Sequence, residues 1–191
     1  MTVQHMSPAG RAELARLEGV VLHVYRDAAG LPTIGVGHLL TAAEFGLPPL
    51  PPGATPAERH AQADAIETAA RARWPSGLSP TQVDDLLSRD LAKFEGGVFM
   101  ALQVPVTQPQ FDALTMFAFN VGTGAFARSN VARAVNGGRL DLVPGCLAQW
   151  NKIRDPATGA LVVSPGLVKR RAAEAAWWQR GTAPATGGAV V

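Results

Sequence analysis

The sequence predicts an α+β fold, in which a short β-hairpin near the N-terminus is followed by helices. Two β-prone runs, VVLHVY and TIGVGHLL, flank a polar turn within residues 20–40. Beyond residue 78, apolar residues recur at helical spacing behind clear helix-start signals. A chain of 191 residues is long enough to bury one substantial core, which can be divided between two lobes.

The first predicted helix ends at Glu18. Ser7 is a suitable N-cap, and Pro8 suits the first helical position because the N–H that it lacks would have no partner there. Gly19 is a natural helix stop. At the C-terminal end of a helix, the dipole and nearby apolar side chains both favour a protonated acid. Glu18 is therefore a candidate general acid.

Asp27 lies nine positions later in a polar turn, where water should reach the carboxylate and keep it ionised. Two environments that push the pKa values of two carboxyl groups apart are typical of a general acid paired with a base. Thr33 follows and can help to hold a water molecule. Taken alone, however, such carboxylates are more often solvated charges, and a threonine after a proline is more often a strand residue.

The string LEGVVLHVYRDAAGLPTIGVGHLLT resembles the N-terminal active-site block of the phage-type lysozymes, glycoside hydrolase family 24. The resemblance implies an endolysin that hydrolyses the β-1,4 bond between N-acetylmuramic acid and N-acetylglucosamine in peptidoglycan. Its catalytic residues would be Glu18, Asp27 and Thr33. Glu18 would protonate the glycosidic oxygen, while Asp27 and Thr33 would activate water on the opposite face. That route inverts the anomeric centre and needs carboxyl groups roughly 6.5–9.5 Å apart.

A second block, residues 108–130, is similar to the core and cleft wall of the family. By this resemblance, Phe119 and Ser129 line the sugar-binding groove together with Leu39 from the first block. Core packing explains Phe119 equally well.

A third block, PGLVKRR, matches a Gly-Leu and paired-arginine motif that precedes the closing helix of the family. We expect Arg170 or Arg171 to reach the Glu18 carboxylate or the substrate. His38 is assigned to structure, because a buried histidine paired with an acid of the small lobe is a more common arrangement than a proton shuttle.

The resemblance also implies a division into lobes. A small lobe would carry the β-hairpin or a short sheet, and a long helix would join it to a mostly helical large lobe. The expected bounds are one lysozyme domain over 1–180, with the small lobe at about 20–78, the large lobe at about 1–18 and 95–180, and a flexible tail at 181–191.

Residues 42–76 depart from the usual spacing of the family and form an insertion within the small lobe. A capping box at Thr55 predicts a helix through about Arg73. This helix has little apolar surface beyond Ile66, so we expect it to lie on the surface. Decoration of the small lobe is favoured over a role in covering the cleft or contacting the wall.

Composition favours a cell-wall partner only weakly. A net charge of +2 and a pI near 9.1 suit any anionic surface, and no nucleic-acid partner is expected. The single Cys146 excludes an internal disulfide, and no Cys/His cluster has zinc spacing, so we expect no cofactor or metal.

Residues 1–17 contain Arg11, Glu13 and Arg16 and lack an apolar run, so neither a signal peptide nor a membrane anchor is expected. We expect a monomer that stays in the host cytoplasm before lysis and depends on a holin to reach the wall.

Three other classes of function stay open. A lytic transglycosylase would use Glu18 but produce an anhydro product, and the presence of Asp27 and Thr33 speaks against it. A non-enzymatic role could rest on the basic segment Leu167–Arg180, whose tryptophan pair is typical of membrane-active helices. The same segment could simply pack as the last helix. A wall-binding protein without catalysis would leave the three predicted catalytic residues unexplained.

Overall fold

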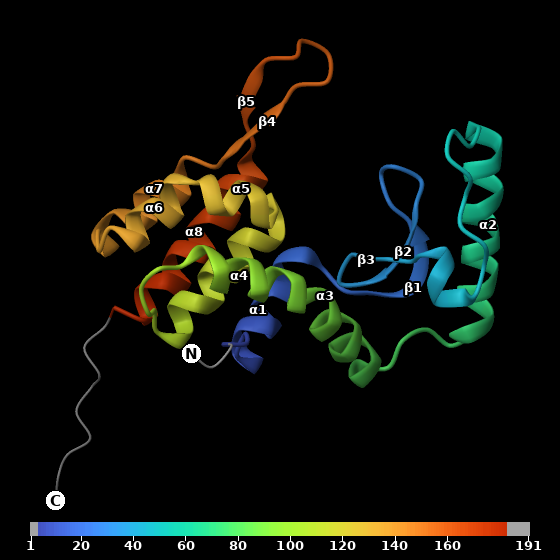
Figure 1. Cartoon of the computed structure of the whole chain (residues 1–191), viewed down its shortest axis with the longest axis horizontal. Helices are drawn as coiled ribbons and strands as arrows, with labels where there is room; N and C mark the ends of the chain where they lie inside the picture. Colours follow the sequence, from blue (N-terminus) through green and yellow to red (C-terminus); the bar gives the residue numbers. More distant parts are fainter. Residues whose placement is uncertain (1–3, 183–191) are drawn as a thin grey trace, which may run out of the picture. The chain divides into compact units, whose positions relative to one another are not determined.

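The computed structural model describes residues 4–182 and divides into two compact units (Figure 1). The small unit comprises Ala15–Asp90, and the large unit comprises Met1–Leu14 with Leu91–Val191. Helices predominate, and the described strands form two small antiparallel sheets, so the predicted α+β class is confirmed. Glu18 belongs to the small unit, in contrast to the prediction that residues 1–18 belong to the large lobe. From residue 183 onward, the predicted tail lies outside the described residues.

A three-stranded antiparallel sheet forms the centre of the small unit. Its strands are β1 (Val21–Arg26), β2 (Pro32–Gly35) and β3 (His38–Leu39), in that order across the sheet. β1 is irregular, because the stretch from Val21 to Tyr25 pairs with the shorter stretch from Gly35 to Thr33. Such a bulge bends a strand and increases its twist. Along the chain, this bulge lies between the two predicted catalytic carboxylates.

The hydrophobic core of the small unit combines the sheet with the segments that follow it. A short 3₁₀ helix, η1 (Ala42–Phe45), precedes helix α2 (Pro56–Arg73). Phe45 packs edge-on against Trp74, with 6.0 Å between ring centroids. The buried members of this core are Val24, Ile34, Leu40, Ile66, Ala70, Leu78 and Leu86.

Helix α2 has the bounds that its capping box predicts. The Thr55 hydroxyl accepts from the Glu58 amide, and the Glu58 carboxylate accepts from the Thr55 amide at 2.7 Å. We expected this helix only to decorate the surface. Its packing is more extensive, since α2 buries Ala63, Ile66 and Ala70 and contacts β1 and β2. Alanine carries little hydrophobic signal in a sequence, which is why this packing face was missed.

Helix α3 (Pro80–Ala101) begins in the small unit and ends in the large unit. A capping box starts this helix, because Ser79 and Gln82 exchange hydrogen bonds of 2.8 and 3.3 Å. The helix continues through Gly96 and Gly97. A β-carbon on Gly97 would lie 2.3 Å from the Thr123 methyl group, so this glycine permits a close approach between segments.

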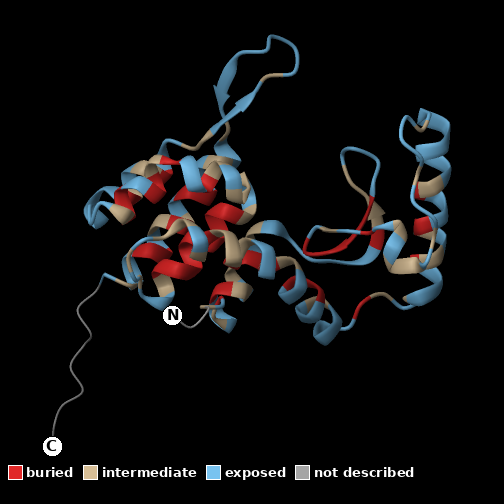
Figure 2. Ribbon diagram, in the orientation of Figure 1, coloured by how far each residue is buried: buried red, intermediate tan, exposed pale blue. Residues whose placement is uncertain are grey.

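The large unit is built around a helix whose central residues, Gln110–Ala118, are all buried (Figure 2). This helix, α4, packs extensively against the C-terminal helix α8. The helix that starts the chain, α1, is anchored nearby, since the Asp112 carboxylate accepts hydrogen bonds from the amide and hydroxyl of Ser7. The described helices of the large unit are α1 (Pro8–Glu18, in part), the C-terminal part of α3, α4 (Gln108–Val121), α5 (Thr123–Arg128), α6 (Asn130–Asn136), 3₁₀ helix η2 (Leu140–Leu142), α7 (Val143–Ala148) and α8 (Pro165–Arg180).

Helix α8 is a packed helix of the large unit. Trp177 and Trp178 are only 8% and 1% exposed, and α8 contacts both α4 and α7. The two tryptophans that suggested membrane activity are therefore core residues in the folded protein. No helix in the described part of the chain is both long enough and apolar enough to cross a membrane.

A second, two-stranded sheet was not predicted. Strands β4 (Lys152–Arg154) and β5 (Leu161–Val163) form a hairpin that projects from the large unit (Figure 1). Strands of three residues are too short to produce a clear period-two pattern.

Candidate active site

Glu18 is the last residue of α1. Gly19 follows with φ of +82°, a conformation that glycine adopts without strain, and β1 begins two residues later. The helix therefore ends where the sequence predicts. Glu18 is exposed. The described residues of the small unit therefore do not surround it with the apolar side chains that we expected for a general acid.

The Asp27 side chain organises the turn that joins β1 to β2. Its Oδ1 atom accepts hydrogen bonds from the amides of Ala29 and Leu31, at 2.8 and 2.9 Å. The main chain closes the same turn, because the Asp27 amide donates to the Leu31 carbonyl and the Gly30 amide donates to the Asp27 carbonyl. The carboxylate is half-buried and is held in one orientation by its own backbone.

Thr33 lies on the central strand β2 and is only 4% exposed. Its hydroxyl donates to the Leu31 carbonyl at 3.0 Å. The peptide groups on either side of Leu31 thus connect two predicted catalytic side chains, since the Leu31 amide binds Asp27 while the Leu31 carbonyl binds Thr33. With its proton committed to Leu31, the Thr33 oxygen keeps lone pairs that can accept a hydrogen bond from water.

Strand register places a predicted substrate contact beside Thr33. Thr33 pairs with Tyr25 on β1 and with Leu39 on β3. Directly opposed residues share one face of a sheet, so these three side chains form a row. Leu39 is 45% exposed and is accessible to a ligand.

His38 lies between two acidic side chains of the small unit. Its Nδ1 lies 2.9 Å from both carboxylate oxygens of Asp90, and its Nε2 lies 2.8 Å from Glu44. The hydrogen bond with Asp90 raises the pKa of His38 above its ordinary value of 6.5, although burial opposes the rise; Glu44 adds to it. Burial alone would raise the pKa of Glu44, but hydrogen bonds with Thr41 and His38 lower it. His38 of β3 thus connects Glu44 of η1 with Asp90 of α3.

The other two predicted groove residues belong to the large unit. Phe119 packs against Phe94, with ring centroids 4.8 Å apart. Ser129 is 2% exposed and caps α6, because its hydroxyl accepts from the Ala132 amide at 3.0 Å. It nevertheless borders an open pocket of about 550 Å³, in which basic side chains lie beside apolar ones; the lining includes Arg128, Arg133, Lys152, Val121, Trp150, Leu161 and Leu167.

Arg170 and Arg171 are buried in α8. Both pair with the wholly buried Glu174, at 3.1 and 3.0 Å. Arg171 also donates to the side-chain oxygen of Asn120 and lies over the Phe117 ring, 4.8 Å from its centroid. This network was not predicted, because Glu174 occurs in an alanine-rich stretch that reads as an ordinary helical surface.

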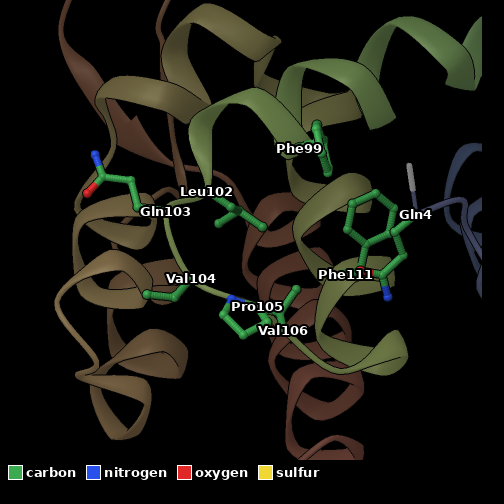
Figure 3. A pocket seen from close by; sticks show the side chains of 8 residues that line it. All are labelled: Gln4, Phe99, Leu102, Gln103, Val104, Pro105, Val106 and Phe111. Carbon is green, nitrogen blue, oxygen red and sulfur yellow. The ribbon is translucent and has the colours of Figure 1, made fainter. Parts of the chain in front are cut away.

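A second pocket of the large unit, about 350 Å³ in volume, is mainly apolar (Figure 3). Phe99, Leu102 and Phe111 line it, and the side chains of Gln4 and Gln103 are its polar members. Its lining residues include no acid or base, so we do not assign it to the chemistry. Within residues 4–182, no group of three or more His, Cys, Asp or Glu side chains could hold a metal ion.

The sequence model of the phage lysozyme family matches residues 15–174. The chain belongs to the phage lysozyme family. The match includes the whole segment that carries Glu18, Asp27 and Thr33, as well as the buried network of α8.

The relatives with similar sequences are phage endolysins. The chain is 33% identical over 171 residues to the SAR-endolysin of Pseudomonas phage phiKMV, covering 87% of this chain and 83% of that protein. It is 31% identical to the endolysin of Salmonella phage P22, covering 81% and 89% of the two chains. The endolysin of Bacillus phage PZA is 41% identical over 135 residues, but that alignment covers 68% of this chain and only 48% of the relative. The chain thus spans about half of that protein.

Solved structures of the family have the same fold. The endolysin from Escherichia coli O157:H7 phage FAHEc1 aligns with a TM-score of 0.69 and 29% identity, covering 93% of this chain and 94% of its own. A P22 lysozyme variant aligns with a TM-score of 0.65 and 28% identity, covering 92% and 99%. The predicted resemblance to phage-type lysozymes is therefore confirmed.

Proposed function

We propose that this protein is an endolysin with muramidase activity. It hydrolyses the β-1,4 bond between N-acetylmuramic acid and N-acetylglucosamine in bacterial peptidoglycan. The main support is the local geometry around Leu31, whose backbone binds Asp27 of the β1–β2 turn and Thr33 of β2. Membership of the phage lysozyme family adds the reaction class.

Glu18 is the general acid in this proposal. It protonates the glycosidic oxygen as the bond to the leaving sugar breaks and the remaining sugar approaches an oxocarbenium ion. Its position at the end of α1 places the carboxyl group at the junction between the helix and the sheet that carries Thr33. Substrate entering beside this residue would supply the water exclusion that the exposed side chain lacks.

Asp27 and Thr33 hold the attacking water. The described hydrogen bonds to the Asp27 carboxylate both end on Oδ1, so we assign Oδ2 to accept a proton from the water. The Thr33 oxygen accepts the second hydrogen bond of the same water, because its own proton is committed to Leu31. Water activated in this way attacks the face opposite the leaving group and inverts the anomeric centre.

Leu39, Phe119 and Ser129 are proposed substrate contacts. Leu39 is supported by its exposure beside Thr33, and Ser129 by its position at the edge of the open pocket of about 550 Å³. Support of Glu18 by Arg170 or Arg171 stays a prediction from the paired-arginine motif.

We further propose a monomer that accumulates in the host cytoplasm and reaches the wall after a holin opens the membrane. The charged residues Arg11, Glu13 and Arg16, which support this proposal, lie within the folded helix α1. Fractionation of host cells before and after holin induction tests it: release of the enzyme without a holin would contradict it.

The decisive variants are Glu18→Gln and Asp27→Ala, assayed on purified peptidoglycan sacculi. Loss of a general acid or base lowers a rate by about 10²–10⁴-fold, so both variants should clear sacculi at less than one hundredth of the wild-type rate. Unchanged circular dichroism would show that they fold. Near-normal clearing by Glu18→Gln would remove this residue from the acid role. Proton NMR of the fresh product should show the α-anomer at the new reducing end, and a β-anomer would contradict inversion.

A further inference from the structure

The residue immediately before Asp27 carries a guanidinium group that links three acceptors. Arg26 donates through Nε to Glu67 at 2.6 Å and through Nη2 to Asp64 at 2.6 Å. Its third nitrogen, Nη1, donates to the Gly30 carbonyl at 3.0 Å. The two acids lie on α2, whereas Gly30 lies in the turn that Asp27 organises. We call these four residues the Arg26 bridge.

Helix α2 holds its end of the bridge firmly. Glu67 also accepts two hydrogen bonds from Arg71, at 2.8 and 3.0 Å. Arg71 in turn donates to the Val24 carbonyl on β1 at 3.2 Å. Hydrogen bonds from Arg71 and then Arg26 lower the pKa of Glu67, so this carboxylate stays ionised at neutral pH. The buried residues Ile66 and Ala70 fix the same stretch of helix in the core.

The turn receives its end of the bridge beside the catalytic carboxylate. Gly30 accepts from Arg26 through its carbonyl and donates through its amide to the Asp27 carbonyl. The next amide, that of Leu31, donates to Asp27 Oδ1. A displacement of the Gly30 peptide would therefore move a donor of the Asp27 carboxylate. Gly30 has φ of +78°, which other residues adopt only with strain, so this turn depends on a glycine at position 30.

We propose that Arg26 is a positioning residue, which uses Glu67 and Asp64 of α2 to hold the Asp27 turn in its catalytic geometry. The helix within the 42–76 insertion would then contribute to catalysis without touching substrate. The inference rests on the proposed function, because it takes Asp27 as the residue that holds the attacking water.

Arginine is required at this position by geometry. Its three nitrogens project in a fixed plane and each has a different acceptor, which a single ammonium group cannot reproduce. Glu67 should matter more than Asp64, since its side chain is 21% exposed and that of Asp64 is 58% exposed. Exposed ion pairs are weakened by water and salt.

The test compares Arg26→Lys with Arg71→Lys, both in the full chain. Arg71 is a matched control because it also binds Glu67 and also connects α2 to β1, through the Val24 carbonyl. Its described hydrogen bonds do not include Gly30. Misplacement of a catalytic group by a fraction of an ångström lowers rates by about tenfold or more. We therefore expect Arg26→Lys to lower kcat on soluble glycan strands about tenfold with little change in KM. Arg71→Lys should retain kcat within about twofold, and Glu67→Gln should resemble Arg26→Lys.

Two further readouts separate this inference from the proposed function. Amide hydrogen exchange at Ala29 and Leu31 should accelerate in Arg26→Lys and stay at the wild-type rate in Arg71→Lys. In an Asp27→Ala background, Arg26→Lys should cause no further loss of kcat, because the two residues act on the same step. Wild-type exchange and kcat in both Arg26→Lys and Glu67→Gln would overturn the inference. A fully active Asp27→Ala would instead overturn the proposed function, while the exchange data would still decide whether the bridge holds the turn.

Discussion

At the scale of single residues, the backbone of Leu31 connects the side chains of Asp27 and Thr33, which we propose to be catalytic. The sequence predicts a turn at Asp27 and a strand at Thr33 from local patterns alone. The amide and carbonyl of Leu31 bind both side chains only because the turn closes and the strands pair in this register. Neither feature can be predicted from the spacing of residues in the sequence. The contact between Arg26 and α2 was missed for a similar reason. Asp64 and Glu67 lie 38 and 41 positions after Arg26 along the chain.

Substitutions at Asp27 and Thr33 should differ in a defined order. Asp27→Ala removes the proposed base and should lower kcat about 10²–10⁴-fold. Thr33→Ala removes only one acceptor of the water and should cost less, about tenfold, while Thr33→Ser should recover most of the loss. Initial rates on purified cell wall provide the comparison. A larger loss for Thr33→Ala than for Asp27→Ala would remove Thr33 from the water-holding role.

His38 should make stability depend on pH. Because the pKa of His38 is raised in the folded state, its stabilisation is complete below about pH 6.5 and is lost as the pH rises through the folded-state pKa. Charge-assisted hydrogen bonds are each worth about 2 kcal/mol, so His38→Asn should lower the free energy of unfolding by about 2 kcal/mol at pH 5.5. Urea titrations should show a smaller difference at pH 9. Equal differences at the two pH values would mean that His38 is not charged in the folded protein.

At the scale of elements, helix starts were predictable and packing faces were only partly so. Hydroxyl caps followed by proline mark α1, α2 and α3 because the signal is local and depends on few residues. The burial of α2 was underestimated, since Ala63 and Ala70 pack through their small size. The β4–β5 hairpin was not predicted, because its strands are three residues long and exposed.

Adjacent glycines of α3 offer an internal comparison. Gly97→Ala would place a β-carbon 2.3 Å from the Thr123 side chain, and overpacking of this kind costs about 1–3 kcal/mol. Gly96 has no atom within 4 Å of such a β-carbon, so Gly96→Ala should stabilise the helix by up to about 1 kcal/mol. Thermal unfolding of the two variants should give midpoint shifts of opposite sign. A shift of the same sign in both would show that Thr123 can move aside.

At the scale of the whole molecule, the C-terminal segment separates two classes of function. Trp177 and Trp178 are buried in the large unit, so the folded chain does not present them to a membrane. The full-length Glu18→Gln variant should therefore release no dye from anionic phospholipid vesicles beyond the buffer control. Dye release together with undiminished lysis of cells by this variant would support a non-enzymatic mode of action.

Mass spectrometry of released muropeptides tests most directly whether the chain is a Glu18-dependent muramidase. Purified peptidoglycan is digested with wild type and with Glu18→Gln, and the new ends of the fragments are identified. Wild type should release fragments with reducing N-acetylmuramic acid ends, and the variant should release none. Anhydro-muramic ends from wild type would contradict muramidase activity and place the protein among the lytic transglycosylases.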